Sequence, residues 1–443
     1  MSTKKSRLIV GIIGNILEWY DFAIFGYLAV TIGVLFFPSD NPTTSLLQSF
    51  SVFAIGYLAR PLGGILFGQL GDKYGRSKAL RLSMYLMGAA TFCMGMLPTY
   101  SQIGIAATVL LVLLRVAQGI SAGGEFVGSA VYMYESSPQK RQTFWCSFAT
   151  WSSTAGVLLG SLVITLLHYL FTQDQIENGG WRIPYLCGAI LAIFGIFVRR
   201  YLLETEVFEN ILSKQKLIKY PLLEAFKYSR KAMLQVLALN VFVSVSFYTL
   251  FVWMPTFLQM FLSIPLEKAL FLNTLMMVLL IMLMPLCGLL ADYIGRERVA
   301  FLSALSIALI AYPVFMLIST GSIWAIGLAL ILFAVCFSLI EGTTAAITTS
   351  LFPADHRYSG IGISYNISMS IFGGTTPLVC TYLISTSGFI TAPGIYVGIT
   401  AVVGLIAIMS LGGITKITFN KRFMESRADN ISDSLCIKNT STE

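Results

Sequence analysis

The stretch GQLGDKYGR, residues 68–76, occurs a second time as GLLADYIGR at residues 288–296. Both copies fit the pattern G-x-L-x-D-x-x-G-R, and each lies between two long apolar runs. The matched residues keep a constant offset and are Asp72 with Asp292, Gly75 with Gly295, and Arg76 with Arg296. A connection that is repeated at the same place in each half of the chain predicts two related halves with a site between them.

The bulk composition is typical of a protein that lies within a lipid bilayer. Of the 443 residues, 56% are hydrophobic and only 11% are charged, and the mean hydropathy is +0.78. Soluble domains carry roughly 25% charged residues, so this chain lacks the polar surface of a soluble enzyme. Apolar runs of about 20 residues, the length that spans a bilayer, recur twelve times. The predicted spans are 8–37, 47–70, 79–97, 103–134, 143–169, 183–202, 231–260, 268–290, 299–318, 322–351, 358–386 and 390–414.

The basic residues between the spans predict the orientation. Of the 29 lysines and arginines, Arg182 and Lys268 fall in loops on one side, Arg60 and Arg115 fall within spans, and all others lie on the opposite side. Basic loops stay in the cytoplasm, so we expect both termini and the central loop to be cytoplasmic. The predicted units are a first half at 1–202, a central loop at 203–230, a second half at 231–414 and a tail at 415–443.

Several functions are disfavoured by the sequence. The formal net charge of +8 is spread over the loops rather than gathered in a patch, which predicts contact with anionic lipids and no binding to nucleic acid. The seven cysteines are scattered, and no Cys/His spacing predicts a metal site or a disulfide framework. The two histidines, His168 and His356, lie near predicted membrane edges. We therefore expect no metal, no cofactor and no enzymatic activity.

Several segments resemble the major facilitator superfamily and, within it, the branch of metabolite–proton symporters. Besides the twin loops they are GNILEWYDF (14–22), RPLGGILFGQLGDKYGR (60–76), RVAQGISAGGEFVG (115–128), WRIPY (181–185), RYSGIGISYN (357–366) and FGGTTP (372–377). The resemblance extends over nearly the whole chain. It implies an all-α membrane protein of twelve transmembrane helices in two six-helix halves, which rock around a central site.

The sequence departs from the pattern of that branch in three places, all near predicted cytoplasmic loops. Ser350 stands before LFP, where an acidic residue is common, and Gln142 replaces a glycine. The stretch ETEVF at 204–208 lacks the usual proline. These differences put the details of cytoplasmic gating in doubt, and not the fold.

Six charged residues fall in the interior of the predicted spans, away from their ends, and they are Glu18, Asp21, Arg60, Arg115, Glu125 and Glu341. A charge in the bilayer costs about 2.5–3.5 kcal/mol or more, so each is a functional candidate. Glu18 and Asp21 lie on one helical face, which must look into the bundle. Glu125 lies among Gly119, Gly123 and Gly128, a small-residue face that favours a helix–helix seam for its side chain, with the central cavity as the alternative.

Asp21 is the predicted proton acceptor, with Arg115 as its partner. The resemblance implies this, because in related proton-coupled facilitators an acid in helix 1 pairs with an arginine in helix 4, and DF and RVAQG match those positions. Protonation of Asp21 would release Arg115 and so alter the substrate site. Two alternatives remain open: a permanent pair that only docks two helices, and Glu18 as the acceptor in place of Asp21.

Other residues are candidates for substrate contact. Arg60 could bind a substrate carboxylate through its planar fork, or it could serve as the counter-ion of Glu18. Glu341 is the candidate of the second half and has no obvious partner. The remaining candidates are Trp19, Tyr20, Tyr365 and Asn366. An aromatic cage suits a quaternary ammonium such as betaine, although most membrane tryptophans and tyrosines are interfacial anchors.

Charged residues at the cytoplasmic helix ends are predicted to gate the site. They are Asp72, Arg76, Glu135 and Arg141 in the first half, and Asp292 and Arg296, with Arg357, in the second. Ion pairs and contacts with helix dipoles can hold one face closed and then break as the halves rock. The alternative is that these residues are rim charges that only set the topology.

We therefore predict a proton-coupled symporter of a small polar organic solute in the cell's inner membrane, with the lipid bilayer as its surroundings and a single chain as the working unit. The resemblance places osmolytes such as proline or betaine first. The alternative solute is a di- or tricarboxylate such as ketoglutarate or citrate, which two intramembrane arginines would fit. A membrane enzyme, a channel or a sensor is the rival class.

Overall fold

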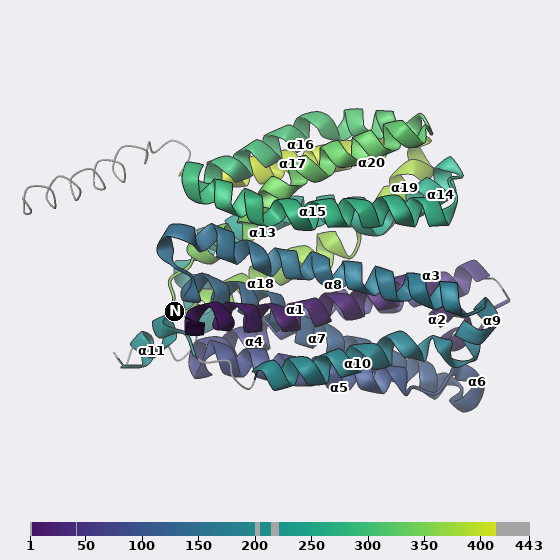
Figure 1. Cartoon of the computed structure of the whole chain (residues 1–443), viewed down its shortest axis with the longest axis horizontal. Helices are drawn as coiled ribbons and strands as arrows, with labels where there is room; N and C mark the ends of the chain where they lie inside the picture. Colours follow the sequence, from purple (N-terminus) through teal and green to yellow (C-terminus); the bar gives the residue numbers. More distant parts are fainter. Residues whose placement is uncertain (1, 41, 200–203, 214–220, 413–443) are drawn as a thin grey trace, which may run out of the picture.

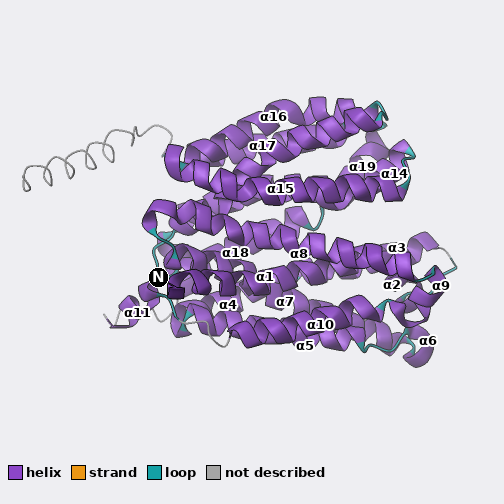
Figure 2. Cartoon of the chain, in the orientation of Figure 1, coloured by secondary structure: helices purple, strands orange, loops and turns teal. Residues whose placement is uncertain are grey.

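The computed structural model describes residues 2–40, 42–199, 204–213 and 221–412. Within these ranges all regular secondary structure is helical and there is no strand (Figure 2). Helices suit an apolar chain because each satisfies its own backbone hydrogen bonds, as a bilayer requires. The long helices run side by side along one direction (Figure 1).

The first half contributes six long helical segments. They are α1 (Ser2–Tyr27) with α2 (Ala29–Phe36), α3 (Pro42–Leu58) with α4 (Arg60–Tyr74), α5 (Arg76–Gly95), α7 (Ile105–Ser136), α8 (Gln142–Leu170) and α10 (Arg182–Arg199). Short turns connect them, namely α6 (Tyr100–Ile103), η1 (Gln139–Arg141), α9 (Gln173–Gln175) and η2 (Ile176–Gly180).

The second half contributes six more. They are α13 (Arg230–Phe247), which continues through η3 (Tyr248–Trp253) into α14 (Met254–Leu262); α15 (Leu266–Ile294); α16 (Arg296–Ser319); α17 (Ile323–Ser350); α18 (Arg357–Ser368), which continues through η4 (Met369–Gly373) into α19 (Thr376–Ser387); and α20 (Ala392–Met409).

Most of these segments are long and apolar enough to cross a membrane. Among the described residues nine helices qualify on length and composition, and eleven do if each of two bent pairs counts as one span. The first bent pair, Gly14–Tyr27 with Ala29–Phe36, turns by 65°. The predicted span 8–37 is therefore broken in two. The remaining long segment is α5, whose first turns carry Arg76, Lys78 and Arg81.

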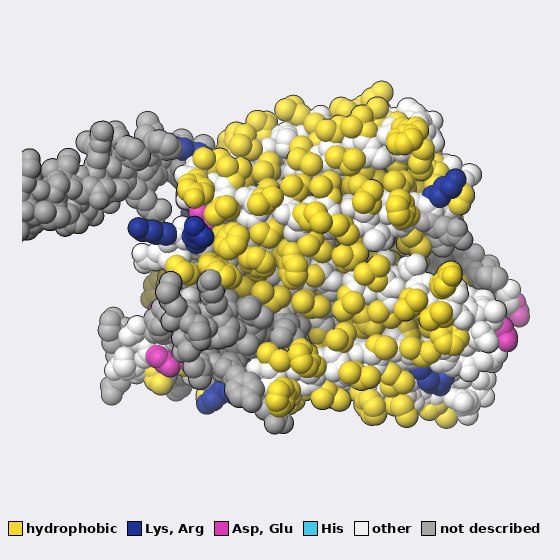
Figure 3. Space-filling view, viewed as in Figure 1, with side chains coloured by type: hydrophobic (Ala, Val, Ile, Leu, Met, Phe, Trp, Pro, Cys, Tyr) yellow, Lys and Arg dark blue, Asp and Glu magenta, His cyan; other side chains and the backbone are white. Residues whose placement is uncertain are grey.

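On the face that Figure 3 shows, the charged side chains on the surface lie toward the two ends of the bundle, and mostly apolar side chains cover the surface between them. One end holds the N-terminus and α11, and the other holds α2, α6, α9 and α14 (Figure 1). We name the first the basic end, because the residues at the starts of α5, α16 and α18, Arg76, Arg296 and Arg357, are located there.

The central segment contains two short helices that were not predicted. They are α11 (Glu206–Ser213) and α12 (Pro221–Tyr228), both within the stretch 203–230 that was expected to be only a polar loop. The predicted tail at 415–443 lies outside the described residues.

Glycines let the helices of the first half approach to backbone contact. A Cβ at Gly119 would collide with the carbonyl oxygen of Gly56, and one at Gly123 would collide with that of Arg60. The small-residue face predicted on α7 is therefore confirmed, since it packs directly on α3 and α4. Gly128 faces the ring of Tyr358 from the second half.

Candidate functional site

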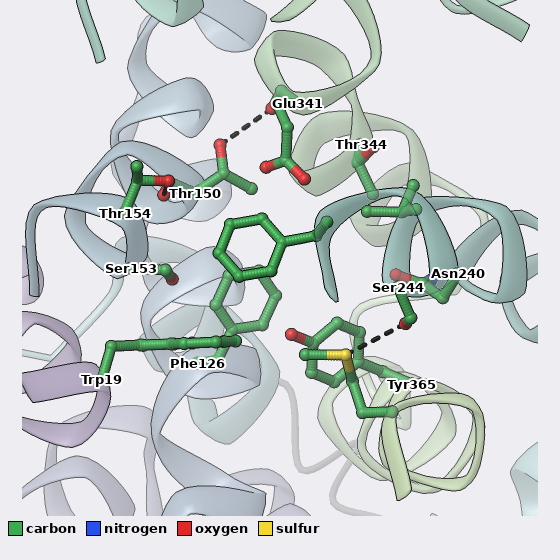
Figure 4. A pocket seen from close by; sticks show the side chains of 13 residues that line it. Trp19, Phe126, Thr150, Ser153, Thr154, Asn240, Ser244, Glu341, Thr344 and Tyr365 are labelled. Carbon is green, nitrogen blue, oxygen red and sulfur yellow. Dashed lines mark hydrogen bonds between the residues drawn. The ribbon is translucent and has the colours of Figure 1, made fainter. Parts of the chain in front are cut away.

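A pocket lies between the two halves (Figure 4). Its walls come from α1, α7 and α8 of the first half and from α13, α17, α18 and η4 of the second. The polar lining residues are Thr150, Ser153, Thr154, Asn240, Ser244, Glu341 and Thr344. The aromatic and aliphatic ones are Trp19, Phe126, Val243, Phe247, Tyr365 and Met369.

The structure brings three of the predicted substrate residues into this pocket. Trp19, Glu341 and Tyr365 line it, and Figure 4 shows all three directed toward the common space. Tyr20 lies elsewhere, because its hydroxyl donates to the carbonyl oxygen of Pro184 at 2.9 Å, in the contact between α1 and α10. Tyr20 is thus placed in the packing of the first half rather than in the pocket.

Arg60 and Asn366 lie next to the pocket without lining it. Arg60 Nη2 is 2.9 Å from Glu18 Oε1, and both side chains are buried. Arg60 Nε also donates to Asn366 Oδ1 at 3.3 Å, and the Asn366 amide donates to the Gly123 carbonyl at 2.7 Å. The geometry favours the counter-ion alternative for Arg60, since Glu18 is its neighbouring acid and Asn366 of the opposite half accepts from its Nε.

Asp21 lies in a second polar cluster, inside the first half. It accepts a short hydrogen bond from the Thr91 hydroxyl and a longer one, 3.4 Å, from Gln118 Nε2. The carbonyl oxygen of the same Gln118 side chain accepts from Arg115 Nη1 at 2.9 Å. Asp21 and Arg115 therefore do not form a direct ion pair in this structure, because Gln118 links them.

Arg115 is held mainly by aromatic rings. Its guanidinium carbon lies 4.3 Å from the ring centroid of Phe25, 4.7 Å from that of Phe22 and 5.7 Å from that of Phe53. Its Nε and Nη2 atoms have no hydrogen-bond partner among the described residues. Cation–π contacts stabilise a desolvated cation by about 2 kcal/mol. The Nε and Nη2 groups of Arg115 are therefore available to form further hydrogen bonds.

Glu125 takes its predicted place at a helix seam. Its carboxylate accepts from the Ser83 hydroxyl at 2.7 Å, which joins α7 to α5, and it is not part of the pocket lining. Its neighbour Phe126 does line the pocket and stacks on Tyr365 with ring centroids 4.6 Å apart. The two neighbouring residues on α7 thus serve different surfaces.

On the side of the pocket away from the basic end, aromatic residues of the two halves meet. The rings of Tyr57 and Tyr248 are edge to face with centroids 5.7 Å apart, and so are those of Trp19 and Phe247. The Ser370 hydroxyl donates to the Tyr57 carbonyl at 2.5 Å. These contacts join α1 and α3 to the π-helical turns η3 and η4 or their edges, and such turns often mark functional sites.

At the basic end the repeated aspartates cap helices of the opposite half. Asp72 accepts from the backbone N–H groups of Tyr358 and Ser359, at 3.3 and 2.9 Å, in the first turn of α18. Asp292 accepts from those of Thr143 and Phe144, both at 2.9 Å, in the first turn of α8. A carboxylate at a helix N-terminus satisfies otherwise unpaired donors and the helix dipole, so both predicted gate residues join the halves here.

An ion-pair network accompanies the first of these caps. Arg76 lies 3.3 Å from Asp72 and 3.4 Å from Glu135, and it donates to the Ala354 carbonyl of the second half at 2.6 Å. Arg357 of the second half lies 2.9 Å from Glu135. Glu135 is thus shared by one arginine from each half.

Among the described residues of the second half, Arg296 is not part of a corresponding network of ion pairs between the halves. Arg296 contacts the adjacent Glu297 at 3.3 Å and the Ala346 carbonyl at 3.4 Å, and Ser350 occupies the position that corresponds to Glu135. The side chain of Arg141 is exposed and makes no ion pair or hydrogen bond with any residue that the structure describes. The predicted gate role of Arg141 and Arg296 therefore has no cross-half contact to support it.

The central segment also reaches the network at the basic end. Glu204 accepts from the backbone N–H groups of Arg76 and Ser77, at 2.9 and 3.2 Å, and so caps α5. The Thr205 hydroxyl donates to Glu135 at 2.7 Å. The stretch ETEVF, which lacks the proline of the family pattern, still binds the twin-loop region.

Several pocket residues were not predicted from the sequence. On α8 they are Thr150, Ser153 and Thr154, whose spacing is that of one helical face. On α13, Asn240, Ser244 and Phe247 follow the same rule. A polar stripe at helical spacing within an apolar run was the available signal. No group of three or more His, Cys, Asp or Glu side chains in the described ranges is placed to hold a metal ion.

Comparison with known proteins places this architecture in a family. Residues 12–377 match the family model described as Major Facilitator Superfamily. The chain is 34% identical over 412 residues to the proline/betaine transporter of Escherichia coli (strain K12), which covers 91% of this chain and 82% of that protein. It is 33% identical over 416 residues to the proline/betaine transporter of Salmonella typhimurium, with 92% and 83% covered.

A solved structure shows the same fold. The proton:xylose symporter XylE bound to 6-bromo-6-deoxy-D-glucose superposes with a TM-score of 0.78 over 92% of this chain and 95% of that one, at 16% identity. The predicted fold class, twelve transmembrane helices in two six-helix halves, is confirmed by the family match and by this superposition. The transporter names of the relatives also confirm that the chain is not an enzyme. The chain belongs to the major facilitator superfamily, and it is a membrane transporter of small solutes.

Proposed function

We propose that the protein is a proton-coupled symporter of a small organic osmolyte, with proline and betaine as the first candidates. The solute class is carried over from the names of relatives that are 33% and 34% identical over nearly the whole chain. The observation that supports coupling is the buried Asp21–Gln118–Arg115 cluster, which holds an acid and a base in the membrane without a direct ion pair between them. An intramembrane acid with an exchangeable partner is typical of proton relays.

The two halves support alternating access. At the basic end, which the excess of loop lysines and arginines assigns to the cytoplasm, the halves are joined by the helix caps of Asp72 and Asp292 and by the Glu135–Arg357 pair. These contacts close the cytoplasmic path to the pocket. Rocking of the halves would have to break them, and would open the pocket to the cytoplasm. We place the transporter in the inner membrane with both termini cytoplasmic, and one chain forms the whole pocket.

A chain of contacts connects the proton cluster to the pocket. Phe22 contacts both arginines, with centroid distances of 4.7 Å to Arg115 and 5.5 Å to Arg60. Arg60 in turn lies 5.7 Å from the ring of Trp19, which lines the pocket. Protonation of Asp21 would weaken its hold on Gln118 and thereby free Arg115 to move. That movement would reach the pocket through Phe22, Arg60 and Trp19.

The test is uptake by purified protein in sealed proteoliposomes. An inward proton gradient should drive accumulation of radiolabelled proline or betaine, whereas a channel would only equilibrate it. Asp21→Asn should abolish accumulation and spare exchange of internal for external solute, because the variant binds solute without a titrating acid. Asp174→Asn, which removes an exposed acid at the other end of the bundle, is the matched control. Uptake by the wild type that ignores both the pH gradient and the voltage would refute the proposal.

A further inference from the structure

Among the described residues that line the pocket, the charged side chain is acidic. Of the lining residues, Glu341 is the one acid, and no lysine, arginine or histidine is among them in the part of the chain that the structure describes. The two intramembrane arginines that would suit a carboxylate substrate are not among the lining residues. Arg60 pairs with Glu18, and Arg115 lies among the rings of Phe22, Phe25 and Phe53.

Glu341 differs from the other intramembrane acids in having no partner. Glu18 has Arg60 at 2.9 Å, Asp21 has Thr91 and Gln118, and Glu125 has Ser83. The Glu341 carboxylate makes no ion pair and no hydrogen bond with any described residue, although its backbone carbonyl accepts from the Thr150 hydroxyl at 2.8 Å. Figure 4 shows this carboxylate turned toward the middle of the pocket.

An unpaired carboxylate in this position indicates that its partner arrives with the ligand. A charge at membrane depth costs several kcal/mol unless it is paired, and Glu341 is only 5% exposed. The surrounding wall suits a cation as well, because Trp19, Phe126, Phe247 and Tyr365 line the same space. Ring faces attract ammonium groups, and cages of aromatic rings are used to bind quaternary ammonium ligands.

We propose that Glu341 binds the cationic nitrogen of the solute, with the four aromatic rings as its cage. The proposal deepens the function given above and rests on this pocket being the substrate site. It assigns the pocket to small solutes that carry a positive nitrogen, and it excludes di- and tricarboxylates. A zwitterion would direct its carboxylate to neutral polar groups that also line the pocket, such as Thr154 and Asn240, rather than to an arginine.

The proposal is tested by equilibrium binding to the purified full-length protein in lipid nanodiscs. The probes are betaine and proline, which carry both charges, choline, which carries only the positive one, and ketoglutarate, which carries only negative ones. The wild type should bind betaine or proline and should not bind ketoglutarate. Glu341→Gln should raise the Kd for these solutes by about tenfold or more, as expected for loss of one charged contact, and Glu341→Asp should lose less.

Controls separate this proposal from protein damage and from the coupling mechanism. Asp174→Asn should bind like the wild type, and size-exclusion profiles should show that Glu341→Gln is folded. An unchanged Kd in Glu341→Gln would overturn the proposal, as would wild-type binding of ketoglutarate in preference to betaine and proline. If proton-driven accumulation fails while Glu341-dependent binding persists, only the coupling proposal falls.

Discussion

Gln118 connects Asp21 and Arg115 of the first half through hydrogen bonds. One end of its amide accepts from Arg115 at 2.9 Å and the other donates to Asp21 at 3.4 Å and to Thr91 at 3.3 Å. Protonation of Asp21 weakens the hydrogen bond from Gln118, because a neutral acid is a poorer acceptor than a carboxylate. Since the same side chain accepts from Arg115, a change at Asp21 can alter the position of Arg115.

Gln118→Leu should therefore uncouple transport. We expect accumulation under a proton gradient to fall at least about tenfold, the scale of one lost hydrogen bond to a charged group, while exchange continues. The measurement compares both activities in the same proteoliposome preparation. Gln118→Glu is the informative companion, since it keeps an acceptor for Arg115 and removes the donor to Asp21. It should be uncoupled as well, and coupled uptake by both variants would show that Gln118 carries no signal.

Individual side chains can be predicted from the sequence where their chemistry alone identifies them. A charge in an apolar run stands out, so the sequence by itself identifies Glu18, Asp21 and Glu341 as candidates. Partners are harder to predict, because a neutral glutamine has no such signature, and Gln118 was missed. The sequence left Arg60 open between substrate and Glu18, and that choice depends on which helix faces which.

At the scale of helices, aspartates of one half cap α18 and α8 of the opposite half and so join the two halves. Asp72→Asn and Asp292→Asn should each weaken the closed cytoplasmic face by about 1 kcal/mol, the typical value of a carboxylate at a helix N-terminus. The population with an open cytoplasmic face should rise roughly fivefold. Distances between spin labels on the basic ends of the two halves would measure that shift. Asp72→Asn also weakens the contact with Arg76 at 3.3 Å, so its effect should be at least as large as that of Asp292→Asn. No shift in either variant would contradict the role of the caps.

The unequal ion networks lead to a second element-scale prediction. Ser350 corresponds to Glu135, and without an acid there Arg296 has only Glu297 and a backbone carbonyl, while the Arg141 side chain has no described partner. Ser350→Glu should give these arginines an acid and should stabilise the closed cytoplasmic face. Because such pairs near solvent contribute about 0–1 kcal/mol, transport should slow only about twofold. Ser350→Gln is the control, and equal slowing by both would rule out a charge effect.

The long helices could be predicted from the sequence, because each coincides with an apolar run. Twelve apolar runs became twelve long helical segments, since a bilayer offers the backbone no other partner. Breaks inside runs were missed, as at the 65° bend between α1 and α2 and at the π-helical turns η3 and η4. Those features depend on packing between helices. The short helices α11 and α12 were missed because their apolar faces are too short to stand out in a polar stretch.

At the scale of the whole molecule, the conformation in this structure requires close contact between the two halves. Gly64 of α4 and Gly362 of α18 face each other across the interface: a Cβ on Gly64 would collide with the Gly362 carbonyl, and one on Gly362 would lie 2.8 Å from the Gly64 carbonyl. Gly156 makes an equally tight contact, but within the first half, where its Cβ would meet the Ile16 carbonyl. The first contact must separate when the halves rock, and the second must not.

A methyl group therefore has opposite consequences at these two places. Gly64→Ala should leave each half intact and wedge the halves apart at the basic end, which shifts the protein toward the form open to the cytoplasm. Cysteine labelling of a Thr154→Cys reporter by a membrane-impermeant reagent added from the cytoplasmic side should then become faster. Gly156→Ala should instead reduce the yield of folded protein, because a half that moves as one body has no open state in which to relieve the clash. If both variants fold equally well and label equally fast, the halves do not move as rigid units.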